Sequence, residues 1–135
     1  MSSGKVADSG FYQLVARLEG ECEVTVGRLG TFLFPVGYYV YTGSARKGLE
    51  SRIARHLRKA KPMRWHIDYL LRHAAAIEVR RYSSGRSECS LSQSVGRLRG
   101  SAVVARGFGS SDCECVTHLF YFRRNPVREL TKSVR

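Results

Sequence analysis

The sequence predicts an α+β fold in which a small mixed or antiparallel β-sheet is flanked by helices. Near the N-terminus apolar and polar residues alternate, which is typical of strands, whereas from residue 49 apolar residues recur at every fourth position, which is typical of helices. Strand-like runs return at 77–82 and 118–122. Strands that give way to helices and then return indicate an α+β protein. A length of 135 residues suits one such domain and is too short for two ordinary ones.

The first elements are strands. Residues 11–18 alternate in polarity and predict a strand with one buried face. Residues 21–26 are expected to be its hairpin partner. A short stretch at 31–34 leads into 38–41, which is rich in aromatic and β-branched residues and predicts a central strand that ends at Gly43.

A basic helix is expected next. Leu49, Ile53 and Leu57 recur every four residues and predict the buried face of a helix that runs to residue 59 and is ended by Pro62. The other face is expected to carry an exposed stripe of cationic groups, because these residues follow helical spacing. The stripe consists of Arg52, Arg55, His56 and Lys59.

The remaining elements follow in chain order. They are a helix at 65–74, a strand at 77–82, an amphipathic helix at 87–98 and a strand at 118–122. Only the two ends lack such patterns. We therefore expect a disordered N-terminal tail at 1–9, one domain at 10–124 and a C-terminal tail at 125–135.

The composition favours nucleic acid as the partner. Hydrophobic residues make up 43% and charged residues 25% of the chain, as in globular proteins. The 23 lysines and arginines against 11 acidic residues give a net charge of +12, which attracts polyanions such as DNA. Simple solubility is the alternative. An anionic membrane is a weaker one, because no predicted helix combines a basic face with a large aromatic face.

The sequence also predicts a compartment. No apolar run approaches the roughly 20 residues that cross a bilayer, and residues 1–9 lack the apolar stretch of a signal peptide. We therefore expect a cytoplasmic protein without a membrane partner. In a reducing compartment its 4 cysteines would stay thiols.

One junction joins a strand to the basic helix through a glycine-containing loop. Glycine at position 43 would let the backbone approach a ligand, and Ser44, Arg46 and Lys47 could hold a phosphate. The alternative is that the tyrosines at 38–41 are ordinary core aromatics.

The motifs around this junction resemble the GIY-YIG nuclease superfamily. Gly10-Phe11-Tyr12 and Tyr41-Thr42-Gly43 stand for its two strand motifs, and the helix with Arg52 and His56 follows. The chain most resembles a poorly characterised archaeal and bacterial branch, sometimes fused to endonuclease-III-like repair enzymes. The segments that carry this closer resemblance are 37–45, 55–57, 65–70 and 108–113.

The resemblance implies a metal-dependent endonuclease that hydrolyses phosphodiester bonds in DNA. It implies that Tyr12 or Tyr41 takes a proton from the attacking water, and that Arg52 binds the scissile phosphate. His56 would support the tyrosine or protonate the leaving oxygen. Glu88, at the start of the helix expected at 87–98, would hold Mg²⁺ or Mn²⁺.

The partner implied by the resemblance is DNA, together with an association with DNA repair proteins. Contacts to the nucleic-acid backbone are expected from Gly43, Ser44, Arg46, Lys47, Arg55 and Lys59.

Two other functions stay open. Ser90 and Gln93 stand where a second acid is expected, so the domain could instead be a catalytically inactive nucleic-acid-binding module. Cys113, Cys115 and His118 could build a zinc-stabilised interaction domain. Their close spacing is not a standard one for zinc, so reduced, buried thiols and a fold that needs no metal are expected.

Overall fold

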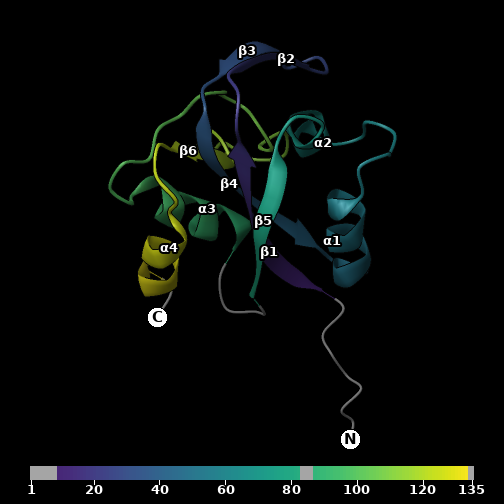
Figure 1. Ribbon diagram of the computed structural model, residues 1–135. Coiled ribbons are helices and arrows are strands. Elements are labelled where there is room, and N and C mark those ends of the chain that lie inside the picture. The colour runs from purple at the N-terminus through teal and green to yellow at the C-terminus, as the bar shows by residue number, and fades with distance from the viewer. Residues whose placement is uncertain (1–8, 83–86, 134–135) are drawn as a thin grey trace, which may run out of the picture.

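Two long central strands organise the structure, a computed structural model that describes residues 9–82 and 87–133. Strand β1 (Gly10–Leu18) pairs with β4 (Gly37–Ala45) along its whole length, from Gly10 opposite Ala45 to Leu18 opposite Gly37. Strand β5 (Ala75–Tyr82) borders β1, and β6 (Leu119–Phe122) borders β4. All three pairings are antiparallel, which confirms the α+β prediction (Figure 1).

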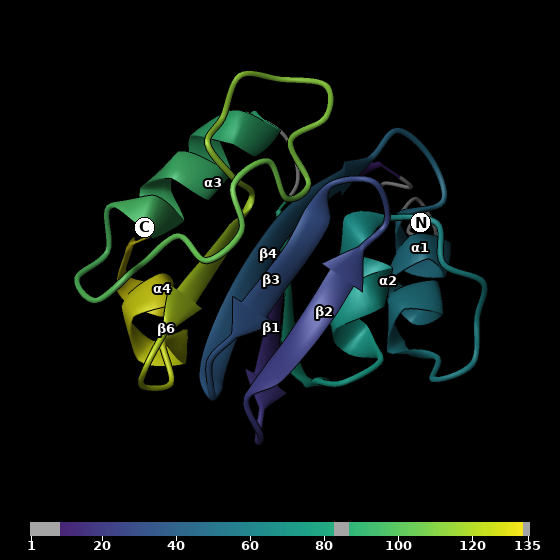
Figure 2. The same cartoon turned by 90° about the horizontal axis from the view of Figure 1, so that it is seen from above.

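Helices cover both faces of this sheet. Helices α1 (Leu49–Leu57) and α2 (His66–Leu71) lie on one side, and α3 (Glu88–Gly96) and α4 (Val127–Ser133) on the other (Figure 2). Strand β1 sends alternate side chains to the two sides. Leu14 joins the larger core, whereas its neighbour Val15 joins a second, smaller one.

This two-sided burial corrects one prediction. Strand β1 is buried almost continuously rather than on one face, because it lies inside the sheet between two helical layers.

The predicted hairpin between 11–18 and 21–26 is also wrong. Strand β2 (Cys22–Val26) pairs with β3 (Gly30–Phe34) in a separate two-stranded sheet. The reason is that β4 and β5 occupy both edges of β1. The β2–β3 hairpin lies beyond one end of the main sheet in Figure 1, and Val24, Val26 and Phe34 contribute to the larger core.

The chain after residue 124 is not a plain tail. Helix α4 occupies most of it, and Leu130 is fully buried in the smaller core with Val15 and Val40. One buried leucine in a seven-residue helix is too short a pattern for helical periodicity to detect.

Most of the predicted N-terminal tail, residues 1–8, lies outside the described residues. Over the ranges that the structure does describe, no helix has the length and apolar character needed to cross a membrane.

Candidate active site

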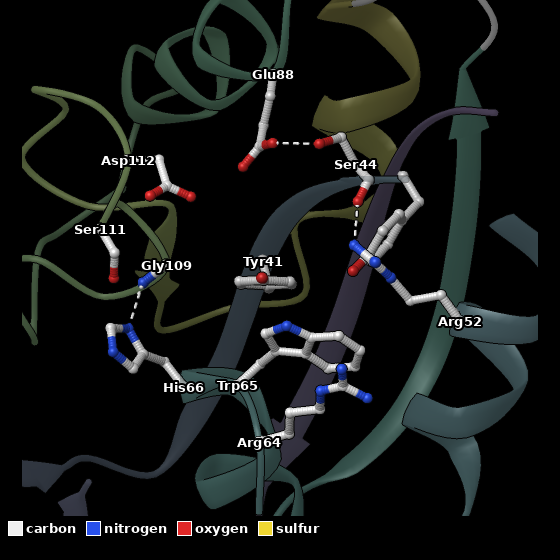
Figure 3. A pocket seen from close by; sticks show the side chains of 11 residues that line it. Tyr41, Ser44, Arg52, Arg64, Trp65, His66, Glu88, Gly109, Ser111 and Asp112 are labelled. Atoms are coloured by element: carbon white, nitrogen blue, oxygen red, sulfur yellow. Dashed lines mark hydrogen bonds between the residues drawn. The ribbon is translucent and has the colours of Figure 1, made fainter. Parts of the chain in front are cut away.

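A pocket opens where several elements meet. Its walls come from β1, β4, α1 and α3, from the start of α2 and from the loop between α3 and β6 (Figure 3). The structure brings Tyr12, Tyr41, Arg52 and Glu88 together on these walls. His56, the other residue with an implied catalytic role, lies behind Tyr12.

Tyr12 occupies a space that depends on Gly43. These two residues face each other across the β1–β4 ladder, and a Cβ atom at Gly43 would lie 2.5 Å from the Tyr12 hydroxyl oxygen. Any side chain at position 43 would therefore displace the phenol. The sequence predicted that a ligand would approach the backbone at Gly43. In the structure the Tyr12 side chain occupies that space.

His56 is buried, which corrects its place in the exposed stripe. The residue is 2% exposed, and Nε2 lies 2.7 Å from the Tyr12 hydroxyl oxygen. Helix α1 buries Leu49, Ile53 and His56, whereas Leu57, predicted to be buried, is 50% exposed. Burial lowers the pKa of His56 to about 4, so the imidazole is neutral at pH 7.

The two phenols are protonated in the free protein. Burial raises the pKa of Tyr12 well above its ordinary value, and the neighbouring Tyr41 raises it further. Burial raises the pKa of Tyr41 in the same direction, followed by the charge of Glu88. Arg52 opposes both shifts because its positive charge favours a phenolate.

Arg52 is oriented from two sides. One guanidinium N–H donates to the Ser44 carbonyl oxygen at 2.5 Å, and the guanidinium carbon lies 4.7 Å from the centre of the Trp65 ring. The first contact uses one of five N–H donors and the second is a cation–π contact. Arg52 is therefore held at the pocket with donors to spare.

Glu88 begins α3 and reaches across the pocket to β4. Its Oε1 accepts a hydrogen bond from the Ser44 hydroxyl at 2.5 Å, and its Oε2 lies 2.7 Å from His118 Nδ1. Burial raises the pKa of Glu88, but the hydrogen bonds from His118 and Ser44 outweigh it and hold the pKa below the usual range. Glu88 is therefore an ionised carboxylate at neutral pH.

Arg55 and Asp68 form a structural pair beside the site. Asp68 is fully buried, and both of its oxygens lie 3.1 Å from Arg55 Nη1. Its Oδ2 also accepts from the backbone N–H groups of Arg64 and Trp65, which lie just before α2. The ion pair occupies the Arg55 guanidinium, which the sequence assigned to the nucleic-acid backbone.

The other cations predicted to contact the nucleic-acid backbone do not line this pocket. Arg46 and Lys47 are exposed just after β4, and Lys59 is exposed beyond the end of α1. A second groove lies beside the pocket and shares Arg52 and Trp65 with it. That groove is lined by Lys47, Gly48, Ser51, Arg52, Ala54, Arg55, Arg58 and Trp65.

The loop between α3 and β6 closes the pocket opposite α1. The Gly109 N–H donates to His66 Nδ1 at 2.8 Å (Figure 3). Ser111 and Asp112 are exposed on this wall.

Sequence reasoning identified three members of one cluster, Cys113, Cys115 and His118, and missed the fourth. Cys89 of α3 lies with Cys113, Cys115 and His118, so four metal-ligating side chains share one place. No spacing rule links Cys89 to the other three, since they are separated by the whole irregular connection to β6.

Residues 11–135 match the model of a family described as domain of unknown function DUF123. The chain belongs to this family. The match spans the whole pocket and the cysteine cluster, so both lie within the DUF123 domain. No curated protein and no solved structure matches the chain.

Proposed function

We propose that this DUF123 domain is a GIY-YIG-type endonuclease that hydrolyses phosphodiester bonds in DNA with Mg²⁺ or Mn²⁺. The supporting observation is that Tyr12, Tyr41, Arg52 and Glu88, from four different elements, line one pocket. They offer a proton acceptor, a phosphate clamp and a carboxylate ligand within reach of one substrate group.

Glu88 fits a hard divalent cation. Each of its oxygens has one hydrogen-bond partner from the protein and keeps a further lone pair. A single carboxylate suits Mg²⁺, which usually keeps several waters and shares the substrate's phosphate oxygens. The cation would supply positive charge at the reacting phosphate.

Tyr12 is the better base of the two tyrosines. Its hydroxyl is hydrogen-bonded to a neutral histidine, and a neutral imidazole can accept a proton. As Tyr12 takes a proton from the attacking water, its own proton passes to His56 Nε2. Tyr12 therefore need not ionise beforehand, which its raised pKa disfavours. Tyr41 would then contact the phosphate.

Arg52 would stabilise the charge that builds on the phosphoryl oxygens. Its orientation is set by Ser44 and Trp65, so little reorganisation is needed when the substrate binds. The neighbouring groove with Lys47 and Arg58 would hold the DNA backbone beside the scissile bond.

Nicking of supercoiled plasmid in the presence of Mg²⁺ or Mn²⁺ tests the proposal. Arg52→Ala should lower the rate about a hundredfold or more, the usual effect of removing a transition-state charge partner. Glu88→Gln should abolish metal-dependent cleavage. Tyr12→Phe should remove turnover without weakening DNA binding, whereas Tyr41→Phe should retain part of the activity.

Arg128→Ala is the matched control, because Arg128 is an exposed arginine on α4, outside the pocket. It should leave the rate unchanged. Wild-type protein that binds DNA but cuts no plasmid, branched DNA or RNA with any divalent ion would contradict the enzyme function. The binding-module function would then take its place.

A further inference from the structure

Three cysteines and a histidine meet beside the pocket. Cys89 comes from the first turn of α3, Cys113 and Cys115 from the following loop, and His118 lies just before β6. Their ligand atoms all lie within 4.8 Å of one another. The four side chains are buried or partly buried, as the ligands of a structural metal usually are.

The distances suit a tetrahedral metal. His118 Nε2 lies 3.5 Å from the Cys113 sulfur and 3.8 Å from the Cys89 sulfur. Zinc with Zn–S bonds of about 2.3 Å and Zn–N bonds of about 2.0 Å separates its ligand atoms by about 3.5–3.8 Å. Only small adjustments would therefore bring these atoms to zinc-binding distances.

Glu88 orients the histidine for this role. A carboxylate can only accept hydrogen bonds, so His118 Nδ1 donates to Glu88 Oε2 at 2.7 Å. In the neutral imidazole this leaves the Nε2 lone pair directed toward the sulfurs. A carboxylate behind a histidine ligand is the usual support of a zinc site. In addition, Gln93 Nε2 lies 3.9 Å from the Cys115 sulfur, where it can stabilise a thiolate.

The cluster lies at the end of a long connection with little secondary structure. Residues 97–118, between α3 and β6, contain no helix and only one isolated β-bridge, at Ala102. A connection of this length with so little secondary structure is uncommon in a compact domain. Phe108 anchors its middle by burial, and the cluster sits at its far end.

We propose that Cys89, Cys113, Cys115 and His118 bind one structural zinc ion. The ion ties the start of α3 to the loop and to β6, and through His118 it fixes Glu88 at the wall of the pocket. The sequence favoured reduced thiols over a zinc site, because the close spacing of Cys113, Cys115 and His118 is not a standard one for zinc. The fold supplies the fourth ligand, Cys89. The zinc site is independent of whether the pocket cleaves DNA.

Metal analysis of the purified wild-type protein tests this directly. We expect about one zinc per chain, and visible absorption bands typical of tetrahedral thiolate-bound cobalt after exchange with Co²⁺. A strong chelator should lower the melting temperature, and added zinc should restore it. A thiol reagent should modify Cys22 readily and the other three cysteines only after the chelator is added.

Single variants locate the site. Cys89→Ser should lose bound zinc, whereas Cys22→Ser is the matched control and should retain it, since Cys22 lies on β2 in the other sheet. Cys115→His keeps a zinc-binding side chain, so it should bind more zinc than Cys89→Ser and less than the wild type. Arg52→Ala should retain full zinc even if its nuclease activity is lost, which separates this inference from the proposed function.

Wild-type protein without zinc whose four thiols react alike would overturn the proposal. So would zinc bound equally by Cys89→Ser and Cys22→Ser. If Cys89→Ser does not fold, the metal content and thiol reactivity of the wild-type protein still decide.

Discussion

His56 is the residue whose environment most sharply limits its chemistry. It is 2% exposed between Tyr12, which bonds its Nε2, and Asp68, whose Oδ1 lies 3.9 Å from its Nδ1. Burial lowers its pKa most strongly; Asp68 raises it, and the cations Lys61, Arg55 and Arg52 lower it again. A neutral imidazole beside a phenol can accept a proton, which an imidazolium cannot do.

The same neutrality predicts a loss of stability in acid. An unfolded histidine has a pKa of about 6.5, whereas folded His56 has a pKa of about 4. Between these values the unfolded chain binds the extra proton. The contribution of His56 is therefore complete above pH 6.5 and is lost as the pH falls toward 4. It amounts to about 3 kcal/mol over that window.

Urea unfolding of wild type and His56→Gln at pH 7 and pH 4.5 measures this effect. The variant should lose much less stability on acidification than the wild type. His73→Gln, at an exposed histidine just after α2, should behave like the wild type. Equal acid sensitivity of wild type and His56→Gln would show that another group is responsible.

At the scale of elements, a helix or strand can be predicted when its pattern of apolar residues repeats, and cannot when the pattern is too short to repeat. Leu49 and Ile53 mark α1 because a helix of nine residues repeats its apolar face more than once. That repeat could not decide between Leu57 and His56, since both lie near the edge of the face and only packing against the sheet selects one. Strand pairing was equally hidden, because alternation in 11–18 identifies a strand but not its neighbours.

Some residues of the candidate site could be predicted from the sequence, whereas the contacts between them could not. Tyr12, Tyr41 and Arg52 lie in motifs that a resemblance can identify, and Glu88 is the acidic residue at a helix start. The Ser44–Glu88 hydrogen bond joins β4 to α3, and the meeting of Cys89 with His118 joins α3 to β6. Such contacts depend on topology, which local patterns in the sequence do not reveal.

The Arg55–Asp68 pair predicts how α1 and α2 are held together. Arg55 lies on α1 and fully buried Asp68 on α2, where it also accepts from the backbone N–H of Trp65. Arg55→Met would leave a buried carboxylate without its cationic partner, and removing one member of a buried pair costs about 3–5 kcal/mol. We therefore expect a marked loss in the free energy of unfolding, measured in urea at pH 7.

Arg58→Met is the control, because Arg58 is exposed at the end of α1. It should cost little stability. If Arg55→Met proves as stable as Arg58→Met and instead weakens DNA binding, Arg55 contacts the nucleic-acid backbone as the sequence suggested.

At the scale of the whole molecule, the charge of +12 is the dominant electrostatic property. For the proposed function, the positive charge matters where the cations lie close to the pocket. Lys47, Arg52 and Arg58 line the groove that continues from the pocket, and Arg46 lies next to it in the chain. Helix α4 also carries exposed cations, but on the opposite face of the sheet.

This distribution predicts a steep and local salt dependence of binding to duplex DNA. Each phosphate contact releases condensed counterions, so the logarithm of the association constant should fall with the logarithm of salt concentration by about 0.9 per contact. Arg46→Ala with Lys47→Ala should weaken binding uniformly across sequences and reduce the slope by about 2. Arg128→Ala with Lys132→Ala removes the same charge from α4 and should leave the slope nearly unchanged.

Equal losses of affinity in both double variants would mean that net charge alone attracts DNA. An affinity independent of salt would contradict phosphate contacts at the groove altogether.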